Sequence, residues 1–254
     1  MRCGLAFVLV ERALAEPVRI DVVGSDVKPV DEATVVVRSG QLVLEDGGDA
    51  SFADVAIVGH ATNYWCSGVL VSRRHVLTAA HCANATAVGF GTKLADITPV
   101  AVTARRVHPT LDAAVLTLAV PTELVVRPRR KHDESAPPLG AVRVIGFGVK
   151  DQLRLTGFGT KRFVDIGIDG WGCTQTRSLQ SGCLPGNELF IRGDQGNDTC
   201  LGDSGGPVFE VVDGTWRLLA ITSRGARPLK LVCGEGGIYV RLDRISAWLE
   251  ESIK

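Results

Sequence analysis

A serine flanked by glycines is the most chemically suggestive feature of this sequence. It is Ser204, in the stretch "CLGDSGGPVF" at Cys200–Phe209. A serine hydroxyl is a weak nucleophile until a neighbouring base removes its proton. Glycines on both sides let the backbone turn sharply and direct its amides at an oxyanion, and Asp203 is placed to hold that turn. The stretch predicts a nucleophile loop; the alternative is a glycine-rich hairpin.

The base that such a serine needs has two upstream candidates in "CSGVLVSRRHVLTAAHC". His81 stands in the small-residue corner "TAAHC", and a disulfide between Cys66 and Cys82 would fix the direction of its imidazole. His75 stands at the start of an expected strand, where an exposed or packed histidine is the simpler interpretation. We therefore assign His81 as the general base. The remaining histidines, which lack such framing, are His60, His108 and His132.

A base histidine works best beside a carboxylate that fixes its tautomer and stabilises the imidazolium. Asp112, in "HPTLDAAVLTLAVP", precedes an apolar strand. Its carboxylate would enter a buried environment, which is costly without a partner, and His81 would supply that partner. The alternative is a carboxylate that only caps the start of the strand.

The order His81, Asp112, Ser204 and the blocks "TAAHC", "LDAAVLTL" and "GDSGGPVF" resemble the chymotrypsin/trypsin family of serine endopeptidases. The resemblance extends over residues 40–254, and one departure is Ala113, where the family usually has Ile or Leu. It implies that Ser204 is acylated, that His81 acts first as base and then as acid, and that Asp112 orients the imidazole. The short loops and the "CSG" of the first block favour secreted bacterial members.

The resemblance also implies roles for the backbone around Ser204. The amides of Gly202 and Ser204 correspond to the oxyanion hole of the family. Asp203 corresponds to the zymogen switch, an aspartate that pairs with a new N-terminal ammonium after the precursor is cleaved.

Substrate preference can be inferred from the same resemblance. Asp198 corresponds to the carboxylate at the base of the primary pocket, which would select Arg or Lys through a charge-assisted hydrogen bond; the alternative is an aspartate in an ordinary turn. Gly225 and Gly237 correspond to the pocket walls, and Ser223 to the serine beneath the triad aspartate. Arg224 departs from the family, which usually has an aromatic residue there. This arginine would favour acidic residues beyond the primary pocket or compete for Asp198.

Seven cysteines bear on the compartment and on metal binding. Removing Cys3 with a leader leaves six, an even number that suits three disulfides in an oxidising compartment. The competing zinc interpretation lacks the usual C-x₂-C spacing, so we expect no metal. With the resemblance, the expected pairs are Cys66–Cys82, Cys200–Cys233 and, as a local variant, Cys173–Cys183.

The N-terminus is expected to carry processing segments. Residues 1–15 combine a basic start, a short apolar run and "ALA" at Ala13–Ala15, which resembles a secretory signal peptide; a cytosolic helix or a misplaced start codon are the alternatives. Residues 16–38 are expected to form a leader or pro-segment, and residues 39–254 the peptidase domain. The stretch "IVGH" at Ile57 lies too close to Cys66 to be an activation site and is interpreted as a strand.

The elements that must position these residues are short strands separated by turns. Many short Val-rich runs and 29 glycines predict an all-β fold, and one expected strand is "LRLTGFG" at 153–159. The resemblance specifies two six-stranded antiparallel β-barrels with the site between them. In the final segment, Ile245, Trp248, Leu249 and Ile253 share one face of a predicted C-terminal helix. The polar, Pro-rich stretch 125–140 is predicted to be an exposed connector.

The function predicted from the sequence is secreted serine endopeptidase activity through an acyl-enzyme, with cleavage after Arg or Lys. Basic and acidic residues number 28 each, so bulk charge gives no support for a nucleic-acid partner, and no stretch is long enough for a membrane span. The expected partners are protein or peptide substrates of a monomer without cofactors. The alternatives are a non-catalytic family homologue that acts as a binding module and an esterase with the same triad, although the G-x-S-x-G motif of α/β-hydrolases is absent.

Overall fold

A computed structural model describes residues 41–42, 52–132, 134–150, 155–192, 198–227 and 233–254. All of them belong to one compact unit, Val36–Lys254. The predicted signal segment (1–15), the predicted pro-segment (16–38) and the boundary at residue 39 lie outside the described residues.

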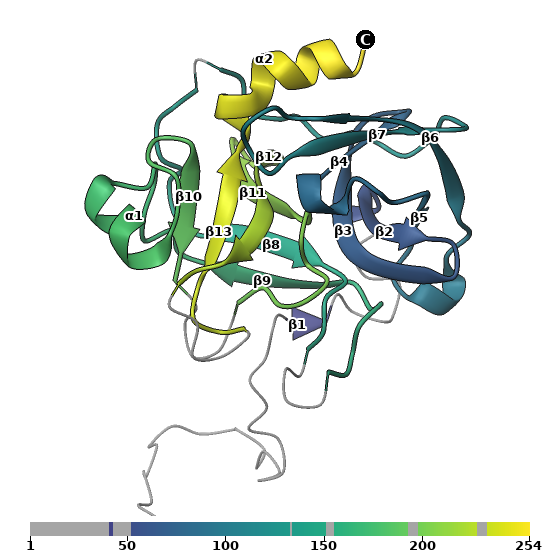
Figure 1. Ribbon diagram of the computed structural model, residues 1–254, viewed down its shortest axis with the longest axis horizontal. Coiled ribbons are helices and arrows are strands. Elements are labelled where there is room, and N and C mark those ends of the chain that lie inside the picture. The colour runs from purple at the N-terminus through teal and green to yellow at the C-terminus, as the bar shows by residue number, and fades with distance from the viewer. Residues whose placement is uncertain (1–40, 43–51, 133, 151–154, 193–197, 228–232) are drawn as a thin grey trace, which may run out of the picture. The chain divides into compact units, whose positions relative to one another are not determined.

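The first half of this unit is a closed antiparallel β-barrel (Figure 1), with the strand order β2-β3-β4-β7-β6-β5. Its apolar runs form strands because alternate side chains can be buried inside the barrel. The strands are β2 (Val55–His60), β3 (Asn63–Ser72), β4 (His75–Thr78), β5 (Ala87–Phe90), β6 (Val100–Val107) and β7 (Ala114–Leu118). Ile57 is fully buried in β2, which confirms that "IVGH" is a strand.

The second half is an antiparallel sheet in the order β1-β9-β8-β11-β12-β13-β10. Its strands are β1 (Gln41–Leu42), β8 (Val142–Gly146), β9 (Arg162–Ile166), β10 (Glu188–Ile191), β11 (Pro207–Val212), β12 (Thr215–Gly225) and β13 (Gly237–Arg241). Six of these strands form the second half of the predicted fold, and the two-residue β1 adds a seventh. The prediction was two six-stranded antiparallel β-barrels with a C-terminal helix. Two antiparallel halves and the helix are confirmed, and among the described residues hydrogen bonding closes the first half into a barrel while the second half is a sheet.

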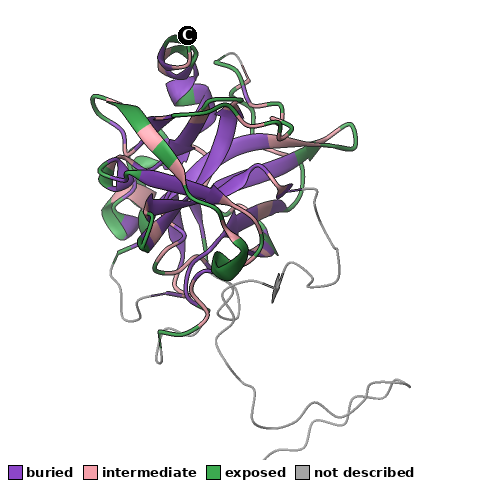
Figure 2. Cartoon of the chain, turned by 90° about the vertical axis from the view of Figure 1, so that its right-hand side faces the viewer, coloured by how far each residue is buried: buried purple, intermediate pink, exposed green. Residues whose placement is uncertain are grey.

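The central apolar core lies between the two halves. It joins Phe52 and Leu77 of the first half to Phe147 and Phe209 of the second. Figure 2 shows buried residues along most of the strands and exposed residues in many of the connections, while β6 is largely exposed. The site residues of the two halves are therefore held by one shared core.

The C-terminal helix α2 (Leu242–Ser252) packs on this core with its predicted face. Ile245 and Leu249 are fully buried, and Trp248 and Ile253 are partly buried against the same cluster. No helix in the described part of the chain is long and apolar enough to cross a membrane.

Two local predictions were wrong or incomplete. The described part of the expected strand at 153–159 forms turns, because Gly157 and Gly159 both adopt a φ of +83°, which is incompatible with an extended strand. The strand follows instead as β9. Sequence analysis also missed α1 (Gln175–Ser181), a short helix that Thr174 caps and Gly182 ends with a φ of +77°.

The connector between the halves is only partly exposed. Val125 and Leu139 are exposed as predicted, but Arg130 is buried. Its guanidinium donates two hydrogen bonds of 2.7 Å to the buried carboxylate of Glu210. A turn-rich composition identified the loop but not this buried ion pair.

Candidate active site

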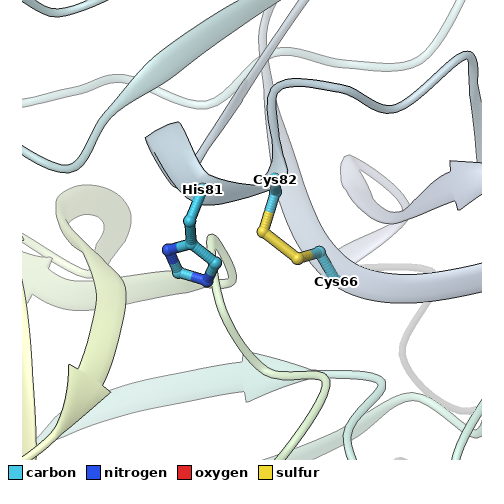
Figure 3. A group of neighbouring side chains, drawn as sticks. All are labelled: Cys66, His81 and Cys82. Carbon is cyan, nitrogen blue, oxygen red and sulfur yellow. A yellow bond between two sulfur atoms is a disulfide. The ribbon is translucent and has the colours of Figure 1, made fainter.

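His81 lies in a single helical turn, Ala80–Cys82, directly after β4. A disulfide joins Cys82 to Cys66 of β3 and pins the turn against the barrel (Figure 3). The side chain of His81 is about half exposed, 49%. The imidazole thus projects from a disulfide-linked corner and is accessible to solvent.

Asp112 fixes the orientation of that imidazole. His81 donates to its carboxylate from Nδ1, at 3.0 Å to Oδ2, and from the backbone amide, at 3.1 Å to Oδ1. Ser223 donates from Oγ to Oδ2 at 2.7 Å. Burial favours the neutral acid, but the hydrogen bonds from His81 and Ser223 outweigh it and hold the pKa of Asp112 below its ordinary value.

Ser204 lies in the loop before β11 and is attached to the first half through its backbone. Its carbonyl accepts a 2.8 Å hydrogen bond from the amide of Ser67, and Cys82 Sγ lies 3.9 Å from the same oxygen. The serine is therefore brought next to the corner that carries His81. In the described structure no hydrogen bond joins the Ser204 hydroxyl to His81; such contacts are often loose until a substrate is bound.

The glycines around Ser204 are required by space as well as by conformation. Gly202 has a φ of +98°, and a Cβ there would lie 2.7 Å from the ring of Phe158. Gly205 has a φ of +81°, and a Cβ there would lie 2.4 Å from the carbonyl oxygen of Ser67. The loop therefore depends on glycine to approach both halves of the molecule closely.

Asp203 is buried beneath this loop. It accepts hydrogen bonds from the amides of Gly148 (2.7 Å) and Cys200 (2.8 Å). Burial raises its pKa to about 6, although these two amides and the charge of Arg162 act in the opposite direction. Among the described residues no basic group lies within ion-pair distance of this carboxylate.

Asp198 is also buried, at 5% exposure, and its carboxylate is held by backbone amides. It accepts from Thr199 (2.7 Å), Gly234 (3.2 Å) and Gly236 (2.9 Å). Burial raises its pKa, and no described basic side chain forms an ion pair with it. The flanking segments 193–197 and 228–232 lie outside the described residues.

The remaining predicted pocket residues lie on two adjacent strands. Gly225 at the end of β12 is directly opposite Gly237 at the start of β13. A Cβ at Gly237 would lie 2.6 Å from the hydroxyl of Tyr239, so a side chain there would force the buried Tyr239 ring to move. Ser223, two residues before Gly225 on β12, donates to Asp112, which links the expected pocket to the His81–Asp112 pair.

Of the two roles suggested for Arg224, competition for Asp198 is wrong. Instead of reaching Asp198, it forms an ion pair with Glu188 of β10, with distances of 2.8 and 2.9 Å. The partner could not be found from the sequence, because 36 residues separate Glu188 from Arg224 and no local pattern links them.

His75, the alternative base, lies in a setting without an orienting carboxylate among the described residues. It pairs with Ser72 through Nδ1 at 2.8 Å, and burial together with the charge of Arg74 lowers its pKa. No described carboxylate orients it as Asp112 orients His81.

The three expected disulfides are present: Cys66–Cys82, Cys173–Cys183 and Cys200–Cys233. Cys66, Cys82 and His81 lie close enough together to resemble a metal-binding group. However, both sulfurs are bonded to one another (Figure 3) and cannot act as thiolate ligands, while His81 Nδ1 donates to Asp112.

Sequence analysis missed Ser67, which is fully buried on β3. Its amide donates to Ser204, its hydroxyl donates to the carbonyl of Gly202 at 2.8 Å, and the hydroxyl accepts from the amide of Phe147 at 3.0 Å. The "CSG" stretch was noted only as a variant of the first block, and nothing local reveals these distant partners.

Comparison with known proteins identifies the class to which this fold and site belong. The family model described as Trypsin matches residues 47–249, and the chain therefore belongs to the trypsin family of serine proteases. It is 30% identical to a trypsin of Saccharopolyspora erythraea, over 82% of this chain and 96% of that protein.

Other relatives come from different groups of organisms. The chain is 27% identical to saxthrombin, a thrombin-like enzyme of Gloydius intermedius, over 85% of this chain and 89% of the relative. It is 29% identical to the CLIP domain-containing serine protease B15 of Anopheles gambiae. The match covers 73% of this chain and 60% of that protease. The structure of mouse neuropsin, a serine protease, matches with a TM-score of 0.66 and 25% identity, covering 80% of this chain and 96% of that one.

Proposed function

We propose that this chain is a secreted serine endopeptidase that cleaves peptide bonds after Arg or Lys. The observation that carries the proposal is the pairing of His81 Nδ1 with Asp112 at 3.0 Å, beside the loop that bears Ser204. Because a carboxylate only accepts hydrogen bonds, this pairing keeps a proton on Nδ1 and leaves Nε2 as the basic nitrogen.

The proposed reaction follows from these positions. His81 Nε2 removes the proton of the Ser204 hydroxyl as Oγ attacks the substrate carbonyl. The amides of Gly202 and Ser204 stabilise the oxyanion, and Asp112 stabilises the imidazolium. His81 then protonates the leaving amine, and water releases the acyl group from Ser204 by the same proton transfers. The reaction requires no metal or cofactor.

The preference for Arg or Lys rests on Asp198. Its buried carboxylate accepts three backbone amides but has no described basic partner, and its raised pKa reflects an anion that is costly to bury. A guanidinium or ammonium from the substrate would supply the missing positive charge. Gly225 and Gly237, opposite each other on β12 and β13, are the proposed pocket walls.

Secretion is supported by the three disulfides, which form and persist in oxidising compartments. The proposed substrates are proteins or peptides, cleaved by a monomer of the type found among secreted bacterial proteases. Asp203 is the proposed zymogen switch, because its buried carboxylate lacks a described cationic partner within ion-pair distance.

The test compares peptides that carry Arg, Lys or Phe before the scissile bond. We expect Ser204→Ala to lower kcat by about 10⁵-fold or more, whereas Ser252→Ala, on α2 outside the site, should leave kcat unchanged.

A second variant tests the specificity. Asp198→Ser should lower kcat/KM for the Arg peptide by about 10²- to 10³-fold and change kcat/KM for the Phe peptide little. Peptide binding without turnover would favour the non-catalytic homologue, and a wild-type preference for Phe would contradict the role of Asp198.

A further inference from the structure

The carboxylate that orients His81 is the end of a longer chain of polar contacts. Asp112 accepts from Ser223 Oγ at 2.7 Å, and Ser223 Oγ in turn accepts from Arg224 Nη1 at 3.0 Å. Arg224 is bound through both terminal nitrogens to Glu188, at 2.8 and 2.9 Å. Five side chains on four separate segments thus form one continuous path from Glu188 to His81.

The direction of each hydrogen bond in this path is fixed by chemistry. A guanidinium has no lone pair to offer, so Arg224 can only donate to Ser223. A serine hydroxyl has a single proton, and with Arg224 occupying a lone pair that proton is directed to Asp112. Donation from a cation also polarises the hydroxyl and strengthens its bond to the carboxylate.

Arg224 is itself held in place from two sides. Its partner Glu188 is fully buried on β10 and also accepts from the amide of Leu184 at 2.7 Å. Arg224 Nη2 donates to the carbonyl of Gly182 at 2.9 Å. Gly182 precedes Cys183, which the local disulfide ties to Cys173, so the carbonyl belongs to a braced turn.

We propose that Glu188 and Arg224 are positioning residues that act on Asp112 through Ser223, an inference that rests on the proposed function of the site. The pair locks the Ser223 hydroxyl as a donor, which holds the Asp112 carboxylate in the plane that His81 requires. Because Glu188 neutralises Arg224, the pair also leaves no free positive charge to select acidic residues beside the pocket.

The decisive variant is the double substitution Arg224→Met with Glu188→Gln. It removes both charges together, so no unpaired carboxylate is left buried, but it also removes the donor to Ser223. We expect kcat to fall about tenfold with KM within about twofold, as for the loss of one charge-assisted hydrogen bond. If the pair only balances buried charge, the double variant will have wild-type kcat, and the proposal is wrong.

A second measurement tests whether the effect passes through Ser223. Ser223→Ala alone should lower kcat, and adding the double substitution to it should cause no further loss, because the shared contact is already gone. Losses that multiply would contradict the proposed path. Arg73→Met is the matched control, since Arg73 also pairs with a carboxylate (Glu123) and a carbonyl (Thr122) but lies on the first barrel; it should leave kcat unchanged.

A readout without turnover separates this inference from the proposed function. The proton between His81 Nδ1 and Asp112 can be followed by NMR in the intact protein. Its resonance should shift in the Arg224→Met, Glu188→Gln variant and not in Arg73→Met. Absence of turnover in the wild type would refute the proposed function alone, whereas an unchanged resonance would refute the positioning role even in an active enzyme.

Discussion

Asp198 and Asp203 lie five residues apart in one loop, both are buried, and both have a raised pKa. Their surroundings give them different proposed tasks. Asp198 accepts from the amides of Gly234 and Gly236, just before β13, the strand that carries one of the two glycines proposed as pocket walls. Asp203 lies under the loop of Ser204, where it accepts from the amides of Gly148 and Cys200.

The raised pKa of Asp203 predicts a specific dependence of stability on pH. Its value is about 6 in the folded protein against 3.8 unfolded, so the folded state binds more protons between these values. The free energy of unfolding should therefore fall as pH rises from about 4 to 6, by on the order of 3 kcal/mol from this group. Denaturant unfolding across this pH range measures it.

Two samples act as controls for that prediction. Asp203→Asn has no titrating group and should lose this part of the slope. If a new amino terminus pairs with Asp203 after processing, the processed protein should also show a smaller slope than the precursor. An equal slope in the precursor and in Asp203→Asn would contradict the assignment to Asp203.

At the scale of elements, helix α2 stabilises the fold by burying the apolar face that its sequence pattern predicts. Its periodic apolar face was predictable, because Ile245 and Leu249 recur at helical spacing, and both are fully buried in the core between the halves. We expect Leu249→Ala to lower the free energy of unfolding by about 2 to 5 kcal/mol. Leu179→Ala on the exposed face of α1 should change it by no more than about 0.5 kcal/mol; equal effects would contradict the packing role.

Elements defined by local signals were predictable, and those defined by distant contacts were not. The blocks around His81, Asp112 and Ser204 combine a motif with a neighbouring strand, so both fold and candidate site followed from sequence. The prediction of a strand at 153–159 was wrong. It rested on the apolar residues of that stretch, whereas Gly157 and Gly159 adopt positive φ, which an extended strand does not allow. The ion pair of Arg224 with Glu188 joins β12 to β10, and neither local sequence pattern predicts it.

For the molecule as a whole, the connector between the halves is tied to the second sheet by charge. Glu210 of β11 accepts from Arg130 of the connector and from Arg217 of β12, and Arg217 also pairs with Glu134. The pair of Arg130 with Glu210 is buried on both sides, so removing one partner leaves an uncompensated charge.

We expect Glu210→Gln to lower the free energy of unfolding by about 3 to 5 kcal/mol. Glu250→Gln, which breaks the more exposed pair with Arg129, should cost no more than about 1 kcal/mol. Thermal and denaturant unfolding of the two variants would check this, and a similar small loss in both would show that the connector is not anchored by Glu210.

Ser67 has a consequence for how the importance of a residue is judged. One buried side chain and its amide hold Gly202, Ser204 and Phe147 together across the boundary between the halves. The proposed function gives Ser67 no contact with the substrate and no proton to transfer. A list of substrate-contacting residues would therefore omit it. Its three hydrogen bonds nevertheless join β3 of the first half to two segments of the second, so we expect the relative placement of those segments to depend on position 67.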